Sequence, residues 1–187
     1  VFMSSHTDAE TIRKTEQITS YGYVVKSSND IALDVQIKMA LKLFAAYTAA
    51  RREKENLEQV FEANPLGMMI VSHDCEVIRV NGTAERIAGR SLTATSRPRC
   101  GDFLGCVNRH LEPRICGKTP ACASCILYTD IRQTIEMRRA TPVHEEPFRI
   151  EISGGDGSVV TEARTLRYNV SPVSLDDQSG AVVAFED

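Results

Sequence analysis

Five of the six cysteines of this chain lie in one stretch, Cys100–Cys125. Four of them, Cys106, Cys116, Cys122 and Cys125, follow the spacing C-x9-C-x5-C-x2-C. Grouped thiols of this kind are typical of metal binding in a reducing compartment, because a small domain built on disulfides needs a higher density of cysteines. We therefore interpret the rest of the chain as a frame that holds this group and reports its state.

Three kinds of site fit the four thiols, and the sequence leaves all three open. An iron–sulfur cluster needs four thiolates and tolerates irregular loop spacing, and it is the preferred prediction. A zinc site of four cysteines more often uses two CxxC pairs, whereas this chain has one, Cys122–Cys125. The third is a pair of redox-active thiols without metal, in which Cys122 and Cys125 form a reversible disulfide. Buried thiols without special chemistry are the plain alternative.

A helix is predicted to begin within the cysteine stretch. Thr119 and Pro120 suit the N-cap and the first helical position, so we expect a helix from about Pro120 to Arg139. Cys122 and Cys125 would then share one face of its first turns. Free N–H groups and the positive end of the helix dipole lower the pKa of a thiol there and favour the thiolate that binds metal.

Other residues in and near the stretch have weaker claims on the site. Gly105 and Gly117 stand beside two candidate ligands and allow close backbone approach. Cys100 is a poorer ligand candidate, since four thiolates suffice. Cys75 falls in a predicted hairpin turn, where we expect it to be exposed and incidental. His110 lies between candidate ligands and could replace one sulfur, or it is a solvated loop histidine.

The chain after residue 64 has the pattern of an antiparallel sheet with helices on one side. A short helix is expected at 82–88, and strands at about 68–72, 77–81, 148–153, 159–171 and 180–185. We therefore predict an α+β fold in which a five-stranded antiparallel sheet carries flanking helices.

The segment FEANPLGMMIVSHDCEVIRVNGTAERIAG resembles the start of a PAS domain. In that family N-P-x-G, here at 64–67, enters the first strand, and an asparagine, here Asn81, ends the second. The resemblance implies a PAS-like sensor domain at 65–187, and GDFLGC…CGKTPAC..C is similar to a cysteine-bearing subset of the family. PAS domains sense ligands, light or redox state, or relay signals and dimerise, so the fold does not name the signal.

The first residues resemble the end of a second signalling domain. FMSSHTD followed by YGYVVKS is similar to the last two strands of a response-regulator receiver domain, which implies a partial α/β fragment at 1–30. Ser4, Tyr23 and Lys26 would be remnants of its phosphoryl site. The family usually has proline after the lysine, where this chain has Ser27, and the strands that carry the phosphorylated aspartate are absent. We therefore expect no phosphorylation of this chain itself.

A connecting helix is predicted at 31–64, because the stretch from Ile31 to Ala63 has no Gly or Pro and is rich in helix-forming residues. Apolar residues in its first half repeat with coiled-coil spacing at Leu33, Ile37, Ala40, Phe44 and Tyr47. We expect a homodimer through this helix or through the PAS domain. The alternative is one helix that completes the receiver-like fragment and caps the next domain.

Composition limits the partners of the chain. Its 42% hydrophobic and 25% charged content is ordinary for a soluble protein, and a net charge of −3 favours no nucleic-acid binding. Because no apolar run reaches about 18 residues and no signal-peptide pattern opens the chain, we expect a cytoplasmic protein without membrane contact.

Taken together, these features predict a non-enzymatic sensory module of a two-component system. Its PAS domain would sense redox state or a gas through an iron–sulfur cluster, and an output domain or histidine kinase would lie outside this chain. The alternative is a PAS dimerisation and interaction module with structural zinc or unmetallated thiols. Thioredoxin-like catalysis would place the CxxC after a strand in a βαβ unit, which the antiparallel pattern does not offer.

Overall fold

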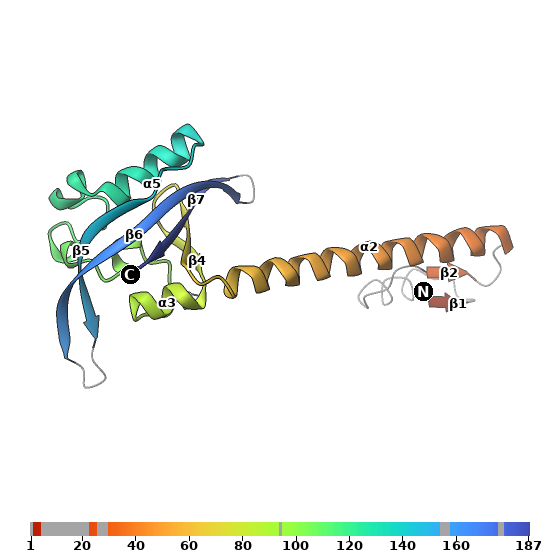
Figure 1. Ribbon diagram of the computed structural model, residues 1–187. Helices are drawn as coiled ribbons and strands as arrows, with labels where there is room; N and C mark the ends of the chain where they lie inside the picture. Colours follow the sequence, from red (N-terminus) through yellow and green to blue (C-terminus); the bar gives the residue numbers. More distant parts are fainter. Residues whose placement is uncertain (1, 5–22, 26–29, 94, 154–157, 176–177) are drawn as a thin grey trace. The chain divides into compact units, whose positions relative to one another are not determined.

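The computed structural model describes residues 2–4, 23–25, 30–93, 95–153, 158–175 and 178–187 (Figure 1). The chain divides into two compact units, Val1–Gln59 and Val60–Asp187, which are described separately. Within the described residues, no helix is long and apolar enough to cross a membrane.

The first unit contains a pair of short strands, β1 (Phe2–Ser4) and β2 (Tyr23–Val25), which run parallel. The predicted helix between them, and Lys26, lie outside the described residues. The receiver resemblance itself stays a prediction.

One long helix, α2 (Asp30–Glu62), occupies the stretch for which the sequence predicts a helix. It stops before Asn64-Pro65, because a proline restricts the residue ahead of it to extended conformations. Exposed pairs four residues apart, such as Lys38 with Asp34 at 2.6 Å, each add only about 0.2–0.5 kcal/mol to the helix.

The second unit is built on a five-stranded antiparallel sheet in the order β4-β3-β7-β6-β5, which confirms the predicted α+β fold class. The strands are β3 (Gly67–Ser72), β4 (Val77–Val80), β5 (His144–Ser153), β6 (Val159–Leu175) and β7 (Gln178–Glu186). β5 begins four residues before the predicted start at residue 148 and contains Pro147. An edge strand tolerates a proline because one of its sides needs no ladder donor.

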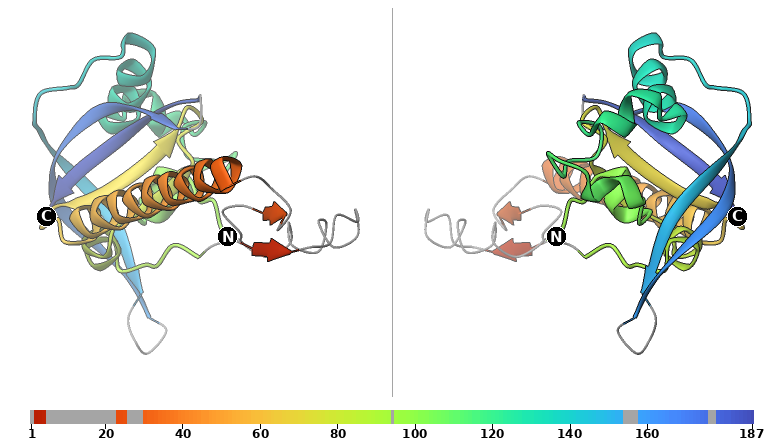
Figure 2. Two further views of the ribbon diagram at one scale, coloured as in Figure 1. Left: turned by 90° about the vertical axis from the view of Figure 1, so that its right-hand side faces the viewer. Right: turned by 90° about the vertical axis from the view of Figure 1, so that its left-hand side faces the viewer.

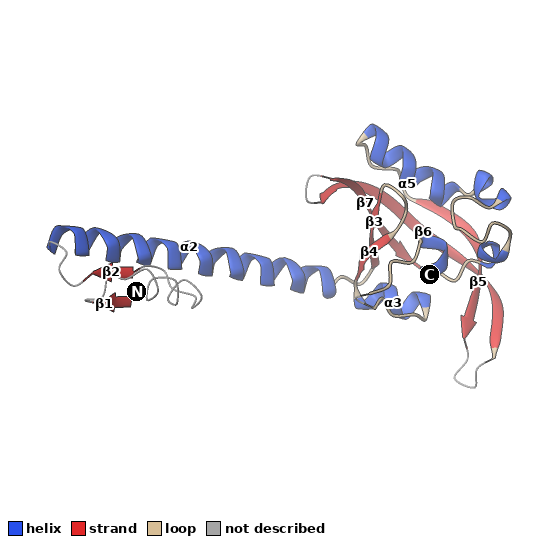
Figure 3. Cartoon of the chain, turned by 180° about the vertical axis from the view of Figure 1, so that it is seen from behind, coloured by secondary structure: helices blue, strands red, loops and turns tan. Residues whose placement is uncertain are grey.

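Helices flank this sheet, as Figure 3 shows by colour. They are α3 (Gly82–Ala88), α4 (Cys100–Phe103), the 3₁₀ turns η1 (Val107–His110) and η2 (Pro120–Ser124), and α5 (Ile126–Met137). Further views show α5 lying along the sheet (Figure 2). Leu127, Ile131 and Ile135 of α5 join alternate residues of β3 and β7 in one buried core. The cysteine-rich stretch therefore runs between α3 and the helix that packs on the sheet.

Asn81 links three elements of this unit through its buried side chain. Its Nδ2 donates to the backbone oxygens of Phe61 at 3.1 Å and Leu66 at 2.9 Å. Its Oδ1 accepts from the N–H groups of Met68 and Ala84, both at 2.9 Å. One amide thus ties the last turn of α2, the entry to β3, and the N-terminus of α3.

Candidate metal centre

The four predicted ligand cysteines line one small cavity. Its volume is about 40 Å³, more than the roughly 10–15 Å³ that a single ordered water requires. The apolar side chains in its wall are those of Leu104, Leu127, Tyr128, Ile131 and Phe148. The structure therefore gathers the thiols of Cys106, Cys116, Cys122 and Cys125 around a shared space with an apolar wall.

Backbone N–H groups point at two of the sulfurs, one from α4 and one from the loop after Cys116. Gly101 N donates to Cys116 Sγ at 3.2 Å, and Gly117 N lies 3.1 Å from Cys122 Sγ. The Thr119 hydroxyl also lies 3.0 Å from the Cys122 sulfur. Hydrogen bonds of this kind stabilise sulfur in its anionic form and tune the potential of a bound iron–sulfur centre.

The other two sulfurs lie near backbone N–H groups. Burial raises the pKa of Cys106 and Cys125, and the N–H groups of Asn108 near Cys106 and of Tyr128 near Cys125 act against it.

Burial is the largest influence on the thiols. It raises the pKa of Cys106 and Cys125, and it raises the pKa of Cys116 to about 12. Negative charge on Cys122 would raise all three further, since its sulfur is near theirs. The lowered pKa predicted for a thiol at this helix N-terminus is therefore wrong for Cys125. A bound cation would compensate the buried charge and displace the protons.

The predicted helix from Pro120 to Arg139 is in fact two pieces. Pro120–Ser124 forms the 3₁₀ turn η2, and α5 begins at Ile126 with Cys125 as its N-cap. Cys122 and Cys125 do not share the face of one α-helix but stand three residues apart across this break. Thr119 is the N-cap residue of η2, yet its hydroxyl contacts the Cys122 sulfur instead of a backbone N–H.

The loop that carries Cys106 is fixed to the edge strand β5. Cys106 forms an isolated bridge with Ile150, and Glu151 N donates to Gly105 O at 2.8 Å. The Glu151 carboxylate pairs with Arg109 at 2.7 Å. Gly105 has φ +72°, and a Cβ there would lie 2.7 Å from Glu151 O. The predicted close approach of backbone at this glycine is therefore present.

Gly101 offers a test of the sulfur geometry. A Cβ at this position would lie 2.8 Å from Cys116 Sγ and 3.4 Å from Cys106 Cβ. We expect Gly101→Ala to displace the Cys116 sulfur and to lower bound metal per chain by at least about 10-fold, as lost ligand positioning typically does. Elemental analysis of the purified variant measures this. Gly82→Ala, whose Cβ would meet nothing nearer than 3.8 Å, is the matched control. Equal metal in both variants would contradict the expectation.

The structure places some of the weaker candidates differently from the prediction. The prediction that Cys75 is an exposed turn residue is wrong, because its side chain is fully buried in the core at 0% exposure. Cys100 lines the cavity, but its thiol donates to Cys75 O at 3.2 Å. His110 is 58% exposed and lies 2.9 Å from the Glu151 carboxylate, outside the cavity wall.

In the part of the chain that the structure describes, no three His, Cys, Asp or Glu side chains are close enough together to hold one metal ion.

A buried polar group beside the site went unnoticed in the sequence. Asp130 on α5 is 7% exposed and accepts from His144 Nδ1 at 2.7 Å and from the Tyr168 hydroxyl at 3.0 Å. Burial, and then the charge of Asp130, raise the pKa of Tyr168, so its hydroxyl remains a donor. These bonds fasten the helix that follows Cys125 to β5 and β6.

Tyr168→Phe is expected to weaken this fastening. The change removes the hydroxyl donor and leaves the ring in place, so we expect the free energy of unfolding to fall by about 2 kcal/mol, as for a lost hydrogen bond to a charged group. Urea denaturation followed by circular dichroism measures it. Tyr47→Phe, at a residue that is 58% exposed, should change stability by less than about 0.5 kcal/mol. Equal stability of the two variants would show that the Tyr168–Asp130 bond does not stabilise the fold.

Comparison with known families bears on this unit. Residues 55–120 match the family model described as PAS domain. The match supports a PAS domain. It includes the segment at 64–67 and Asn81, on which the resemblance rests. It also includes Cys106 and Cys116, whereas Cys122 and Cys125 lie beyond its last residue.

Solved structures similar to this chain include several PAS domains. The PAS domain of nitrogen regulation protein NR(II) from Vibrio parahaemolyticus is 14% identical, with 68% of this chain and 94% of that chain covered and a TM-score of 0.44. The PAS domain of an HTR-like protein from Haloarcula marismortui is 12% identical, covering 73% and 98%, with a TM-score of 0.42. A PAS domain from Colwellia psychrerythraea is 12% identical, covering 71% and 94%, with a TM-score of 0.48. A search of curated proteins returned no match.

Proposed function

We propose that this chain is a sensory signalling module whose PAS domain holds an iron–sulfur cluster and responds through it to redox state or to a gas. The observation that carries the proposal is the arrangement of four thiols around one cavity with an apolar wall. Cys106, Cys116, Cys122 and Cys125 would hold the cluster. A bound cluster supplies one-electron chemistry and reactivity toward oxygen or nitric oxide, with its potential set by hydrogen bonds and solvent exclusion.

The spacing of the cysteines along the chain supports a cluster over a single zinc ion. A zinc site of four cysteines more often uses two CxxC pairs, whereas this chain has one, Cys122–Cys125. An iron–sulfur cluster needs four thiolates and tolerates irregular loop spacing.

The site also has an approach from the surface. A pocket of about 280 Å³ is lined by Cys106 and Cys125 together with Asn108, Ser124 and Arg149. Cys116 and Cys122 line the small cavity and not this pocket. A small oxidant or gas could reach the centre on the side of Cys106 and Cys125. This supports a role in sensing over a purely structural one.

The proposed signal passes through contacts that the chain already makes. Loss or oxidation of the cluster would change the sulfur acceptors of Gly101 and Gly117, whose N–H groups lie 3.2 and 3.1 Å from Cys116 Sγ and Cys122 Sγ. The loop before Cys125 would rearrange, and Cys125 is the N-cap of α5. Because α5 is fastened to the sheet, a shift of its first turn would reach β5 and β6.

The wider setting of the module is part of the proposal. It would be a non-enzymatic component of a two-component system, preceded by a receiver-like fragment, and would act on an output domain or histidine kinase outside this chain.

The alternative function, a dimerisation module with structural zinc or bare thiols, is favoured by one feature of α2. Ile37, Phe44 and Tyr47 of the predicted seam are exposed on α2. A second copy of the chain is the proposed partner of this face in either case.

A paired measurement tests the sensing role. The protein is purified without oxygen, and its visible absorbance and backbone hydrogen exchange are recorded before and after addition of air or nitric oxide. We expect the absorbance to bleach and exchange to increase within residues 100–137. A chain that holds the cluster but shows unchanged exchange after bleaching would contradict sensing, and a colourless chain would contradict the cluster.

A further inference from the structure

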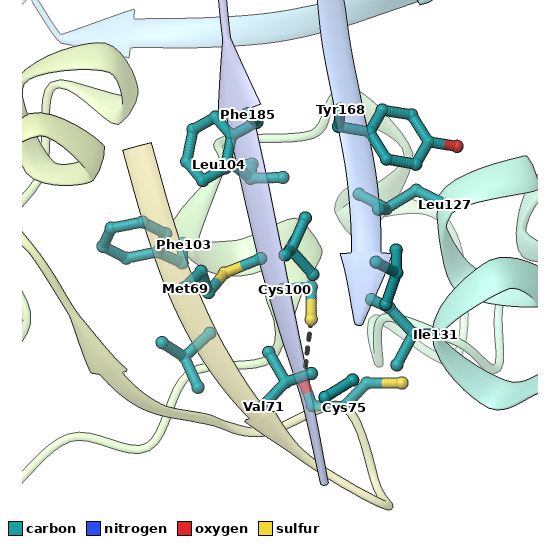
Figure 4. Close-up of a cluster of buried hydrophobic side chains, with 14 of the residues drawn as sticks. Met69, Val71, Cys75, Cys100, Phe103, Leu104, Leu127, Ile131, Tyr168 and Phe185 are labelled. Atoms are coloured by element: carbon teal, nitrogen blue, oxygen red, sulfur yellow. Dashed lines mark hydrogen bonds between the residues drawn. The ribbon is translucent and has the colours of Figure 1, made fainter. Parts of the chain in front are cut away.

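A second pair of cysteines, Cys75 and Cys100, lies outside the proposed ligand set. Glu76 and Arg99 form an isolated antiparallel bridge, and each cysteine is the next residue on its side of it, Cys75 in the β3–β4 turn with φ +59° and Cys100 at the start of α4. Cys100 N donates to Cys75 O at 3.0 Å, and the Cys100 thiol donates to the same oxygen at 3.2 Å. Figure 4 shows both side chains within the buried cluster, with the dashed line marking the second bond.

This contact suits a covalent link, because Cys100 Sγ lies 3.2 Å from a backbone atom of Cys75, and disulfides span about 4.4–6.8 Å between Cα atoms. Both side chains are free thiols in the core, at 0% exposure for Cys75 and 4% for Cys100. Each thiol also changes the pKa of the other.

The two thiols are unequal. The neighbouring Cys100 thiol lowers the pKa of Cys75, and the positive charges of Arg99 and Arg132 lower it further, against the effect of burial. The Cys75 thiol and then burial raise the pKa of Cys100 well above its usual range. Because the thiolate is the nucleophile in thiol chemistry, Cys75 is suited to attack and Cys100 to follow.

We propose that Cys75 and Cys100 form a second redox site, a dithiol that hydrogen peroxide closes to a disulfide. The Cys75 thiolate attacks one oxygen of the peroxide, the O–O bond breaks, and a sulfenic acid and one water form. The Cys100 sulfur then displaces the hydroxyl group from Cys75 as a second water, and the S–S bond closes. Two thiols lose two electrons and two protons, and one peroxide becomes two waters.

The surroundings of Cys75 and Cys100 indicate how peroxide reaches the pair and what a disulfide would change. Cys75 lies in the β3–β4 turn beside His73 and Asp74, whose side chains are 55% and 75% exposed, so a local opening of the turn exposes its sulfur. The disulfide would join this turn to the first residue of α4. The next residue, Gly101, donates a hydrogen bond to Cys116 Sγ. Oxidation of the Cys75–Cys100 pair would therefore shift a hydrogen-bond donor of the four-cysteine site. The dithiol does not require that site to hold a metal.

Peptide mapping of the unaltered chain tests the proposal. The reduced protein is treated with hydrogen peroxide and a chelator, its remaining thiols are alkylated under denaturing conditions, and the fragments are identified by mass spectrometry. We expect a fragment in which Cys75 and Cys100 are linked, in most of the chains, and its loss after dithiothreitol. Alkylated Cys75 and Cys100 at doses that oxidise other cysteines would overturn the proposal, as would links of either residue to a different partner.

Two variants test the roles assigned to Cys75 and Cys100, and the folding of each variant is checked separately. In Cys100→Ser, the proposal predicts that Cys75 is trapped as a sulfenic acid, which a dimedone probe labels, while Cys75→Ser leaves Cys100 unlabelled. Near-ultraviolet circular dichroism shows whether each variant is folded, and the mapping of the unaltered chain stands without them. Equal labelling of Cys75 and Cys100 in the two variants would contradict their assigned roles.

Discussion

Replacing Cys122 by serine is expected to lower iron and acid-labile sulfide per chain by at least about 10-fold, because the loss of an interaction that only orients a ligand already costs a metal site that much. Cys122 is buried, and its sulfur is near those of Cys106, Cys116 and Cys125. A serine oxygen keeps the size of the side chain roughly constant but removes the soft thiolate that iron–sulfur clusters require. Elemental analysis and visible absorbance of the anaerobically purified variant measure the loss.

A matched control lies two residues further along the chain. Ser124 is exposed on the same 3₁₀ turn, and its hydroxyl donates only to Ala121 O at 3.2 Å among the bonds that the structure gives it. Ser124→Ala should keep the iron and sulfide of the unaltered chain. If Cys122→Ser keeps them too, while folded by circular dichroism, Cys122 is not a ligand.

Replacing Asn81 by leucine is expected to lower the free energy of unfolding by about 3–5 kcal/mol. The side chain of Asn81 is fully buried, and leucine has nearly its shape without its polar atoms. The N–H groups of Met68 and Ala84 and the carbonyl oxygens of Phe61 and Leu66 would each lose a partner. Buried groups left without partners cost about 1–3 kcal/mol each, partly offset by relaxation and by water. Urea denaturation measures the change.

A substitution at an exposed polar residue should do little. Asp74 has a side chain 75% exposed in the β3–β4 turn, and Asp74→Asn should change stability by less than about 0.5 kcal/mol. A loss below about 1 kcal/mol for Asn81→Leu would mean that water or a shift of the backbone replaces the amide. The role of Asn81 as the tie between α2, β3 and α3 would then be wrong.

Local patterns were enough to predict the sheet and the grouping of the four thiols. Alternating apolar residues and Gly-rich or Asp-rich turns mark the five strands, and α3 covers the residues predicted for it. The cysteine spacing indicated a shared site because thiols crowded into one short stretch are rarely unrelated. The strand pattern and the PAS resemblance both place Asn81 at the end of the second strand. The four hydrogen bonds of its side chain to backbone 13 to 20 residues away leave no mark in the sequence.

Features that depend on tertiary packing could not be predicted in this way. The turn that holds Cys75 is polar on both sides, yet its bridge to Arg99 brings the thiol into the core. His144 and Asp130 lie far apart in the chain, and only the antiparallel return of β5 beside α5 makes them partners. The break between η2 and α5 follows from the contacts of Thr119 and Cys125 with sulfur and backbone, which helix propensity does not describe.

One measurement tests the central claim most directly, namely the metal and sulfide content of the unaltered chain after purification without oxygen. The proposed site predicts a brown protein with broad visible absorption, with iron and acid-labile sulfide present in equal amounts and little zinc. A colourless protein that carries one zinc per chain, or a folded protein that carries neither metal after reconstitution with iron and sulfide, would contradict it.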